Sequence, residues 1–215
     1  MEVGRRLGDV EIVSVDSMQV YRGMDIGTAK PTAAERAEVV HHCIDLVEPT
    51  DEFNVGDFKA AQRAAIASIA ARRHRALLVG GTGLYHRVVV DDFDLPGEFP
   101  ETRRGLESEP DTERLHARLV ELDPEAAAKM EPGNRRRVVR ALEVTLGSGR
   151  PFSGYGPGVD AYPPSSVVQI GVRRPRAVIA ARIERRVHDM VEAGLIDEVT
   201  RLLAAGFSRS AGQAL

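Results

Sequence analysis

Asp16 is the residue of this chain whose position most directly suggests chemistry. It stands at the end of a β-branched apolar run, Glu11–Ser17, which we expect to form a buried strand of a parallel sheet. Ligands of open α/β sheets bind beyond the carboxyl ends of the strands, and a carboxylate there can act as a general base or as a magnesium ligand. Capping of a turn by Asp16 or Ser17 explains the same position equally well.

A glycine-rich turn and one arginine are two further candidates for binding an anion. Gly80–Tyr85 (GGTGLY) follows a second apolar run, and its glycines would let backbone amides approach a phosphate or a nucleobase while Thr82 adds a hydroxyl. A tight strand-to-helix turn would have the same composition. Arg186 borders the apolar stripe of a long helix, between Ile183 and Met190. Its guanidinium is either held rigidly toward a phosphate or belongs to an ordinary surface arginine.

A cluster of arginines is the candidate for contact with nucleic acid. It consists of Arg135, Arg136, Arg137 and Arg140, and two of these, Arg136 and Arg140, lie one helical turn apart on a face shared with Glu143. Such a cluster either contacts a phosphate backbone or forms a solvated, salt-bridged face. The formal net charge of the chain is −3, so no global basic excess decides between the two.

Two familiar ligand-binding patterns are not matched. His41–Asp45 (HHCID) lacks the usual zinc spacing, and Cys43 is expected to be a buried thiol instead. A Walker A loop needs a glycine immediately before its lysine, but Lys30, Lys59 and Lys129 follow Ala, Phe and Ala. The 215 residues therefore contain no P-loop.

The elements that must position these residues have the pattern of an α/β fold. Three apolar runs are expected to be buried parallel strands: Glu11–Ser17, Ala76–Gly81 and Val167–Val172. Between the first two, Val55–Arg73 carries apolar residues at helical spacing. Strands that alternate with helices predict a parallel sheet.

A charged segment without strand signals interrupts this pattern. Residues 96–134 are rich in proline and contain two expected helices, TERLHARLVEL and DPEAAAKM, the second capped by an aspartate. We predict that this segment is a small helical insertion. Residues 1–95 and 135–215 would then form a discontinuous α/β core.

The second half of this core is expected to be mostly helical. One helix is predicted from about Asn134 to Leu146, stopping at Gly147. A Gly/Pro-rich loop follows at residues 147–166, of a kind that is usually functional or mobile. A long helix is expected over Arg176–Ala205.

Composition limits the class of protein. The chain is 43% hydrophobic, enough to bury a core, and its single cysteine fits a reducing compartment. No apolar run approaches the roughly 18 residues that a membrane span needs, and the charged N-terminus does not have the pattern of a secretory signal. We expect a soluble cytoplasmic protein that binds no membrane.

Taken together, these blocks resemble the tRNA dimethylallyltransferases, also called tRNA isopentenyltransferases. The blocks that carry the resemblance run in the family's order over essentially the whole chain: SVDSMQVYRGMDIGTAKP, HHCIDLVEP, LLVGGTGLY, RRRVVRALEV and RIERRVHDMVEAGLIDEV. The resemblance implies a P-loop NTPase-like, ATP-binding type of α/β core with a helical insertion, and magnesium as cofactor. It also implies transfer of a dimethylallyl group from its diphosphate to N6 of the adenine beside the anticodon, in tRNAs that read codons starting with U.

The resemblance also implies a role for individual residues. Asp16 matches the general base, and Asp16, Ser17, Met18 and Gln19 match the segment that receives the flipped-out adenine. Thr82 matches a threonine near the reacting centre and the tRNA. The leaving diphosphate would be neutralised by an arginine. That arginine corresponds to Arg186, and the other tRNA-contacting positions correspond to Arg103, Arg136, Arg137, Val138, Val139 and Arg140.

The departures from the family's pattern lead to further expectations. The family's first strand and P-loop have no counterpart here, and both ends look cut, so we expect this chain to be inactive by itself. Its expected partners are the tRNA anticodon stem-loop and dimethylallyl diphosphate, and it is expected to be a monomer. Three alternatives stay open: an adenylate isopentenyltransferase, a nucleotide kinase-like relative, and a catalytically dead fragment that binds tRNA.

Overall fold

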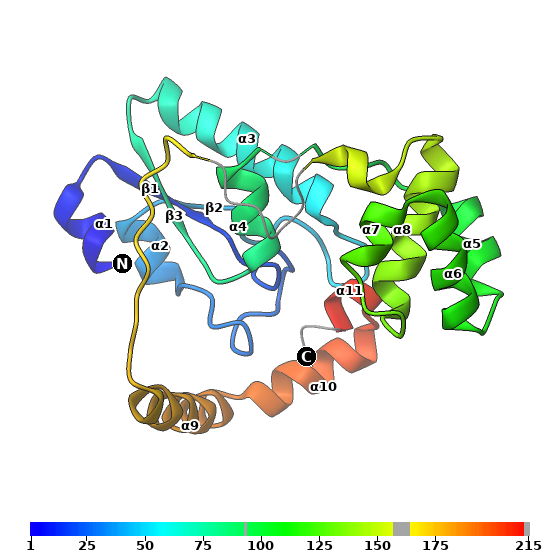
Figure 1. Ribbon diagram of the computed structural model, residues 1–215. Helices are drawn as coiled ribbons and strands as arrows, with labels where there is room; N and C mark the ends of the chain where they lie inside the picture. Colours follow the sequence, from blue (N-terminus) through cyan, green and yellow to red (C-terminus); the bar gives the residue numbers. More distant parts are fainter. Residues whose placement is uncertain (93, 157–163, 213–215) are drawn as a thin grey trace. The chain divides into compact units, whose positions relative to one another are not determined.

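A three-stranded parallel sheet organises the first of two units (Figure 1). The computed structural model describes residues 1–92, 94–156 and 164–212. Unit 1 comprises residues 1–90 and 165–215, and unit 2 comprises residues 91–164. The sheet and the helices that cover it lie in unit 1, whereas unit 2 is helical.

The sheet has the order β2-β1-β3, and all of its strands are parallel. β1 (Val10–Ser14) lies between β2 (His41–His42) and β3 (Arg75–Val79), and every residue of β1 is buried. A continuous β-branched run suits a strand that is covered on both faces. The two strands expected at the N-terminal half are therefore confirmed, with their ends shifted by one to three residues. β2 adds a short strand that its polar sequence did not indicate.

The main helix against this sheet is α3 (Val55–Ala71). It begins at a capping box in which the Asn54 side chain accepts from the backbone of Asp57, and the Asp57 carboxylate accepts from the Asn54 N–H. Phe58 is fully buried and stacks on Tyr85, with ring centroids 4.1 Å apart. The remaining helices of unit 1 are α1 (Glu2–Leu7), α2 (Ala33–Glu38), α4 (Gly83–Val90), α9 (Arg176–Glu192), α10 (Leu195–Ala205) and α11 (Arg209–Gly212).

A buried carboxylate joins the central strand to its neighbours. Glu11 on β1 is only 2% exposed, and Arg72 donates to its two oxygens at 2.8 and 2.7 Å. The rings of His42 and His74 lie 2.6 and 2.9 Å from the same carboxylate. The hydrogen bond from Arg72, helped by those from the two histidines, outweighs burial and lowers the pKa of Glu11 to about 2.

Glu11 is expected to make stability depend on acid pH. Its pKa is lower in the folded protein than its usual value of 4.5, so the stabilisation is complete above that pH and is lost as the pH falls toward 2. Glu11→Gln should lower the free energy of unfolding at neutral pH by about 1–3 kcal/mol. It should also flatten the loss of stability between about pH 5 and pH 3 in urea titrations. Glu192→Gln removes an exposed carboxylate and serves as the control; coincident pH profiles for Glu11→Gln and the wild type would contradict this account.

The prediction of a third strand at Val167–Val172 is wrong. The segment makes no strand in the structure, and Val168, Ile170 and Val172 are 84–87% exposed. A parallel strand forms only when a neighbour completes its hydrogen bonds, and within the described residues β3 pairs with β1 alone. The segment has the apolar pattern of a strand, but within the described residues it pairs with no strand of the sheet.

The long C-terminal helix expected over Arg176–Ala205 is two helices. α9 ends at Glu192 and α10 begins at Leu195, because Gly194 between them has a φ of 100°. This conformation costs a glycine little and cannot continue a right-handed helix.

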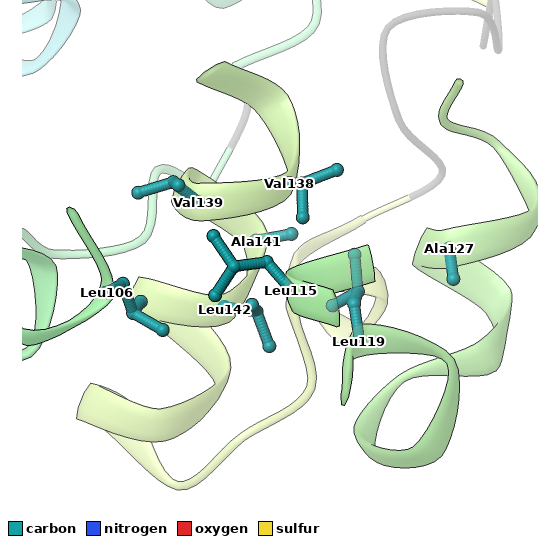
Figure 2. Packing of buried hydrophobic residues seen from close by; sticks show 8 residues of the cluster. All are labelled: Leu106, Leu115, Leu119, Ala127, Val138, Val139, Ala141 and Leu142. Atoms are coloured by element: carbon teal, nitrogen blue, oxygen red, sulfur yellow. The ribbon is translucent and has the colours of Figure 1, made fainter. Parts of the chain in front are cut away.

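Unit 2 contains the helices α5 (Pro100–Glu107), α6 (Thr112–Leu122), α7 (Pro124–Ala128) and α8 (Arg135–Ser148), followed by a short 3-10 helix, η1 (Phe152–Tyr155). As expected, the Asp123 side chain caps α7 by accepting from Ala126 N–H. Figure 2 shows the core that the helices share: Leu106, Leu115, Leu119, Ala127, Val138, Val139, Ala141 and Leu142.

α8 differs from the prediction in the unit to which it belongs and in the residue at which it ends. Residues 135–148 were assigned to the α/β core, but α8 packs against α5 and α6 in unit 2 because its buried side is apolar. The helix also runs past Gly147 and ends at Gly149, whose φ is 70°. Gly147 is needed for packing instead: a Cβ there would lie 2.1 Å from the Phe99 ring.

Part of the Gly/Pro-rich loop, residues 157–163, lies outside the described residues. In the part of the chain that the structure describes, none of the helices combines the length and the apolar character required to cross a membrane.

Candidate active site

The carboxyl end of β1 continues into a tight turn that Asp16 holds. The Oδ1 atom of Asp16 accepts from Met18 N–H at 2.8 Å and from Gln19 N–H at 3.4 Å. The other carboxylate oxygen, Oδ2, has no hydrogen-bond partner among the described residues. Asp16 therefore caps the turn with one oxygen and leaves the second for a ligand, so the two roles that the sequence left open are compatible.

Thr82 lies beside this turn, as expected from its place after β3. Its Oγ1 accepts from Ser17 N–H at 3.1 Å and lies 3.4 Å from Ser17 Oγ. Gly80 makes this approach possible, because a Cβ there would lie 2.1 Å from the carbonyl oxygen of Val15. At the glycine-rich segment, the backbone after β3 thus passes close to the backbone after β1. This approach brings Thr82 to the residue next to Asp16.

Gln19 closes the turn, but its side chain is occupied within the protein. Its Nε2 donates to the carbonyls of Thr28 and Ala29 at 3.2 and 3.3 Å, and its Oε1 accepts from Ser14 Oγ at 2.9 Å. The amide group therefore uses both of its donors and one of the two acceptor positions on its oxygen. The expected binding segment Asp16–Gln19 therefore exists as a folded turn.

Three charged residues near this turn were not identified from the sequence: Lys30, Asp45 and Glu198. The ammonium of Lys30 is buried and donates to Tyr21 O, to Asp25 Oδ1 and to Asp45 Oδ1. The only signal in the sequence was the position of Lys30 within the family-like block. Glu198 gave no local signal, because the backbone amides that it binds are far away in the sequence.

Arg186 is the remaining candidate for the site. It is exposed on α9 and borders an open cavity of about 650 Å³ that Asp25, Lys30, Arg36 and Asp189 also line. Among the described residues, no hydrogen bond or ion pair connects Arg186 with Asp16 or Thr82. The structure thus brings Asp16, Ser17 and Thr82 together, and within the part of the chain that it describes it shows no hydrogen bond or ion pair from Arg186 to any of them.

Cys43 is a buried thiol, as expected. It is 4% exposed in the core of unit 1, and burial raises the pKa of its thiol to about 11, so it is a poor nucleophile. The neighbouring histidines have other partners, His41 with Val39 O and His42 with Glu11.

In unit 2, several arginines of the expected tRNA surface are used within the protein. Arg140 donates to Glu143 at 2.8 Å and to Pro96 O at 2.9 Å. Arg103 lies 3.5 Å from the same carboxylate, which is buried, and donates to Glu107 at 2.9 Å. Two of the expected RNA-contacting arginines therefore neutralise a buried carboxylate, so part of their charge is compensated.

The rest of the cluster divides into exposed and buried positions. Arg136 and Arg137 are exposed, and within the described residues neither has an ion-pair partner. Arg135 instead donates to backbone carbonyls between α5 and α6. Val138 and Val139 lie in the hydrophobic core of unit 2, so their side chains cannot reach a tRNA (Figure 2). Helical periodicity explains this alternation, since neighbouring residues point to different sides.

A carboxylate at the carboxyl edge of a parallel sheet is typical of α/β enzymes that bind their ligand beyond the strand ends. A family model described as IPP transferase matches residues 19–215. The chain belongs to this family. A tRNA dimethylallyltransferase of Kineococcus radiotolerans is 49% identical over 210 residues, which cover 95% of this chain and 66% of the relative. One from Roseiflexus castenholzii is 50% identical over 207 residues, 94% of this chain and 67% of the relative.

Solved structures agree with this assignment. The full-length tRNA isopentenylpyrophosphate transferase of Bacillus halodurans is 42% identical and superposes with a TM-score of 0.62, over 97% of this chain and 66% of the other. A eukaryotic dimethylallyltransferase acting on tRNA gives a TM-score of 0.77 at 24% identity, over 95% and 52%, and supports the fold alone. The α/β fold class with a P-loop NTPase-like parallel core is confirmed. The chain spans about two thirds of the length of the relatives that it matches.

Proposed function

We propose that this chain carries the acceptor side of a tRNA dimethylallyltransferase. The substrate would be the adenine next to the anticodon of tRNAs that read codons starting with U, and the donor would be dimethylallyl diphosphate. One observation carries the proposal: the turn at Asp16 keeps one carboxylate oxygen free, within a folded segment that Thr82 supports. The names of the relatives supply the substrate class.

In the proposed reaction Asp16 is the general base. The exocyclic nitrogen N6 of the adenine attacks the allylic carbon of the donor, and the bond from that carbon to the diphosphate oxygen breaks. The electron pair leaves with the diphosphate, and the proton of N6 passes to the free oxygen of Asp16. An aromatic amine is a weak nucleophile, so removal of this proton during attack favours the reaction. The adenine would be turned out of the anticodon loop to reach Asp16, Ser17 and Met18.

The leaving diphosphate needs positive charge. Arg186 is proposed for this role by family correspondence, and it borders the cavity that Lys30 and Arg36 also line. Magnesium would accompany the diphosphate, because Mg²⁺ is usually held by one or two carboxylates together with substrate phosphates. The described residues contain no group of three or more His, Cys, Asp or Glu side chains that could hold a metal.

Arg136 and Arg137 are the proposed contacts with the tRNA backbone. Both side chains are exposed and form no ion pair with any residue that the structure describes, whereas Arg103 and Arg140 share their charge with Glu143. A contact of this kind favours any tRNA and weakens as salt concentration rises. The same observation also favours the second candidate function, tRNA binding without catalysis.

Arg136→Ala/Arg137→Ala is expected to reduce binding of an anticodon stem-loop RNA and to lower the slope of log affinity against log salt concentration by about 2. Fluorescence anisotropy at several salt concentrations measures both quantities. Arg114→Ala/Arg118→Ala removes two exposed arginines from α6 and is the control, although Arg114, unlike Arg136 and Arg137, pairs with Glu109 at 3.5 Å. An unchanged slope in the Arg136/Arg137 variant would exclude this surface.

The choice of acceptor is tested by competition. If unit 2 serves tRNA, an anticodon stem-loop should displace labelled RNA far better than free AMP does. Preference for AMP would favour an adenylate isopentenyltransferase instead. We further propose that the chain acts as a monomer in the cytoplasm, where tRNA is available; sedimentation at several concentrations tests the first of these statements.

A further inference from the structure

A buried carboxylate fastens the loop Asp25–Lys30, called here the anchored loop, to α10. Glu198 is 2% exposed, and its two oxygens accept from the backbone N–H groups of residues 25–27 at 2.9–3.1 Å. Three successive N–H groups converging on one anion form a binding nest. Loop and helix also touch, because a Cβ on Gly27 would lie 3.2 Å from Leu195 Cδ1.

The other end of the anchored loop is held by Lys30. Its side chain is 1% exposed, and the ammonium donates to Asp25 Oδ1 at 3.0 Å, to Asp45 Oδ1 at 2.6 Å and to the carbonyl of Tyr21. All three donors of the ammonium are therefore used. Ala29, next to it, has a φ of 47°, a conformation that a non-glycine residue keeps only when its surroundings impose it. The loop is thus held at both ends by buried charged side chains.

The anchored loop in turn holds the turn at Asp16. The carbonyls of Thr28 and Ala29 accept both donors of the Gln19 amide, and Ser14 Oγ donates to its oxygen. The backbone N–H of Gln19 reaches Asp16 Oδ1. The side chain of Gln19 is therefore committed to the loop, and a bound base would meet the backbone of the turn.

We propose that Glu198 and Gln19 are positioning residues: Glu198 fixes the anchored loop, the loop fixes Gln19, and Gln19 fixes the orientation of the Asp16 carboxylate. A helix from the end of the chain thereby governs the geometry of the acceptor-base site. The hydrogen bonds of this series are observed in the structure, whereas the effect of the coupling on the adenine rests on the proposed function.

Amide hydrogen exchange of the whole chain tests the coupling. In Glu198→Gln, a side-chain NH2 replaces one accepting oxygen and faces backbone donors, so the amides of residues 25–27 should exchange about tenfold faster. If the coupling is real, the amides of Met18 and Gln19 also exchange faster, although they do not touch Glu198. Asp197→Asn, with the same charge change at an exposed neighbouring position, should leave both groups unchanged. Faster exchange limited to residues 25–27 would overturn the proposal.

A second variant keeps the test decisive if Glu198→Gln does not fold. Gln19 is half-buried, so Gln19→Met removes its side-chain hydrogen bonds with little change in volume. The amides of Met18 and Lys30 should then exchange faster, and in the double variant the effect at Met18 should be smaller than the sum of the two single effects. Unchanged exchange at Met18 in Gln19→Met, or full additivity, would overturn the coupling.

RNA binding then separates positioning from mere stability. Wild-type protein should bind a stem-loop with the target adenine more tightly than the same RNA with an abasic site there, and Glu198→Gln should lose this ratio while keeping the salt dependence of binding. A variant that keeps the ratio overturns the positioning role. If the wild type shows no such preference, the proposed function fails, and the exchange data alone decide the coupling.

Discussion

The 215-residue polypeptide is expected to transfer no dimethylallyl group to tRNA at a measurable rate. The 215 residues contain no Walker A sequence, and within the described residues no hydrogen bond or ion pair joins Arg186 to the turn at Asp16. A leaving diphosphate needs such anion-binding groups close to the reacting atoms. Incubation of purified protein with unmodified tRNA and radiolabelled dimethylallyl diphosphate, with magnesium present, measures this directly.

A second experiment adds to the 215 residues the segment that the family resemblance implies. A fusion in which a family member's first strand and its Gly-x-x-x-x-Gly-Lys-Ser/Thr loop precede Met1 should restore transfer, because β3 has a strand on only one side in the described residues and can pair with another. A fusion with the lysine of that loop changed to alanine is the control and should stay inactive. Robust transfer by the 215-residue polypeptide alone would refute the expectation.

Asp16→Asn in the active fusion is expected to reduce the rate of transfer by about 10²- to 10⁴-fold. Asparagine keeps the oxygen that caps the turn, so Met18 and Gln19 can still donate to it. It lacks the second carboxylate oxygen that would take the proton from N6. The binding of stem-loop RNA should therefore change little, and single-turnover rates measure the loss in the chemical step.

Asp51→Asn is the matched control for this substitution. Asp51 also accepts a backbone N–H in a turn, from Glu48 at 3.0 Å, but it is exposed and lies outside the site. It should leave the rate unchanged. A rate of Asp16→Asn within a few-fold of the wild type would show that Asp16 is only a turn cap and would remove the general base from the mechanism.

The parts of the fold that the sequence predicted are those whose signals are local. The helix after Asn54, the aspartate cap of α7 and the buried run of β1 each depend on residues within a few positions of one another, and all three form as expected. Val167–Val172 failed for the opposite reason. Its apolar pattern is suitable for a strand, but a strand also needs a partner that no local pattern supplies.

In the candidate site, too, residues with a local signal were predicted, whereas contacts between distant segments were not. Its first residues, Asp16 and Thr82, were expected from their places after two apolar runs, because parallel strands end at one edge. The partners of the arginines were not: Glu143 takes part of the charge of Arg103 and Arg140, and only the packing of unit 2 shows this. The buried carboxylate of Glu143 requires positively charged partners, because an uncompensated charge in a core costs free energy.

The sequence by itself determined the family, the parallel α/β class and the position of the proposed base, because each is written in contiguous blocks of residues. Only the tertiary structure decided which oxygen of Asp16 is free, and that Glu198 holds the anchored loop from α10. These features depend on hydrogen bonds between segments far apart in the chain. Their formation requires the backbone to be brought together by burial of apolar side chains, and the spacing of residues along the chain does not reveal it.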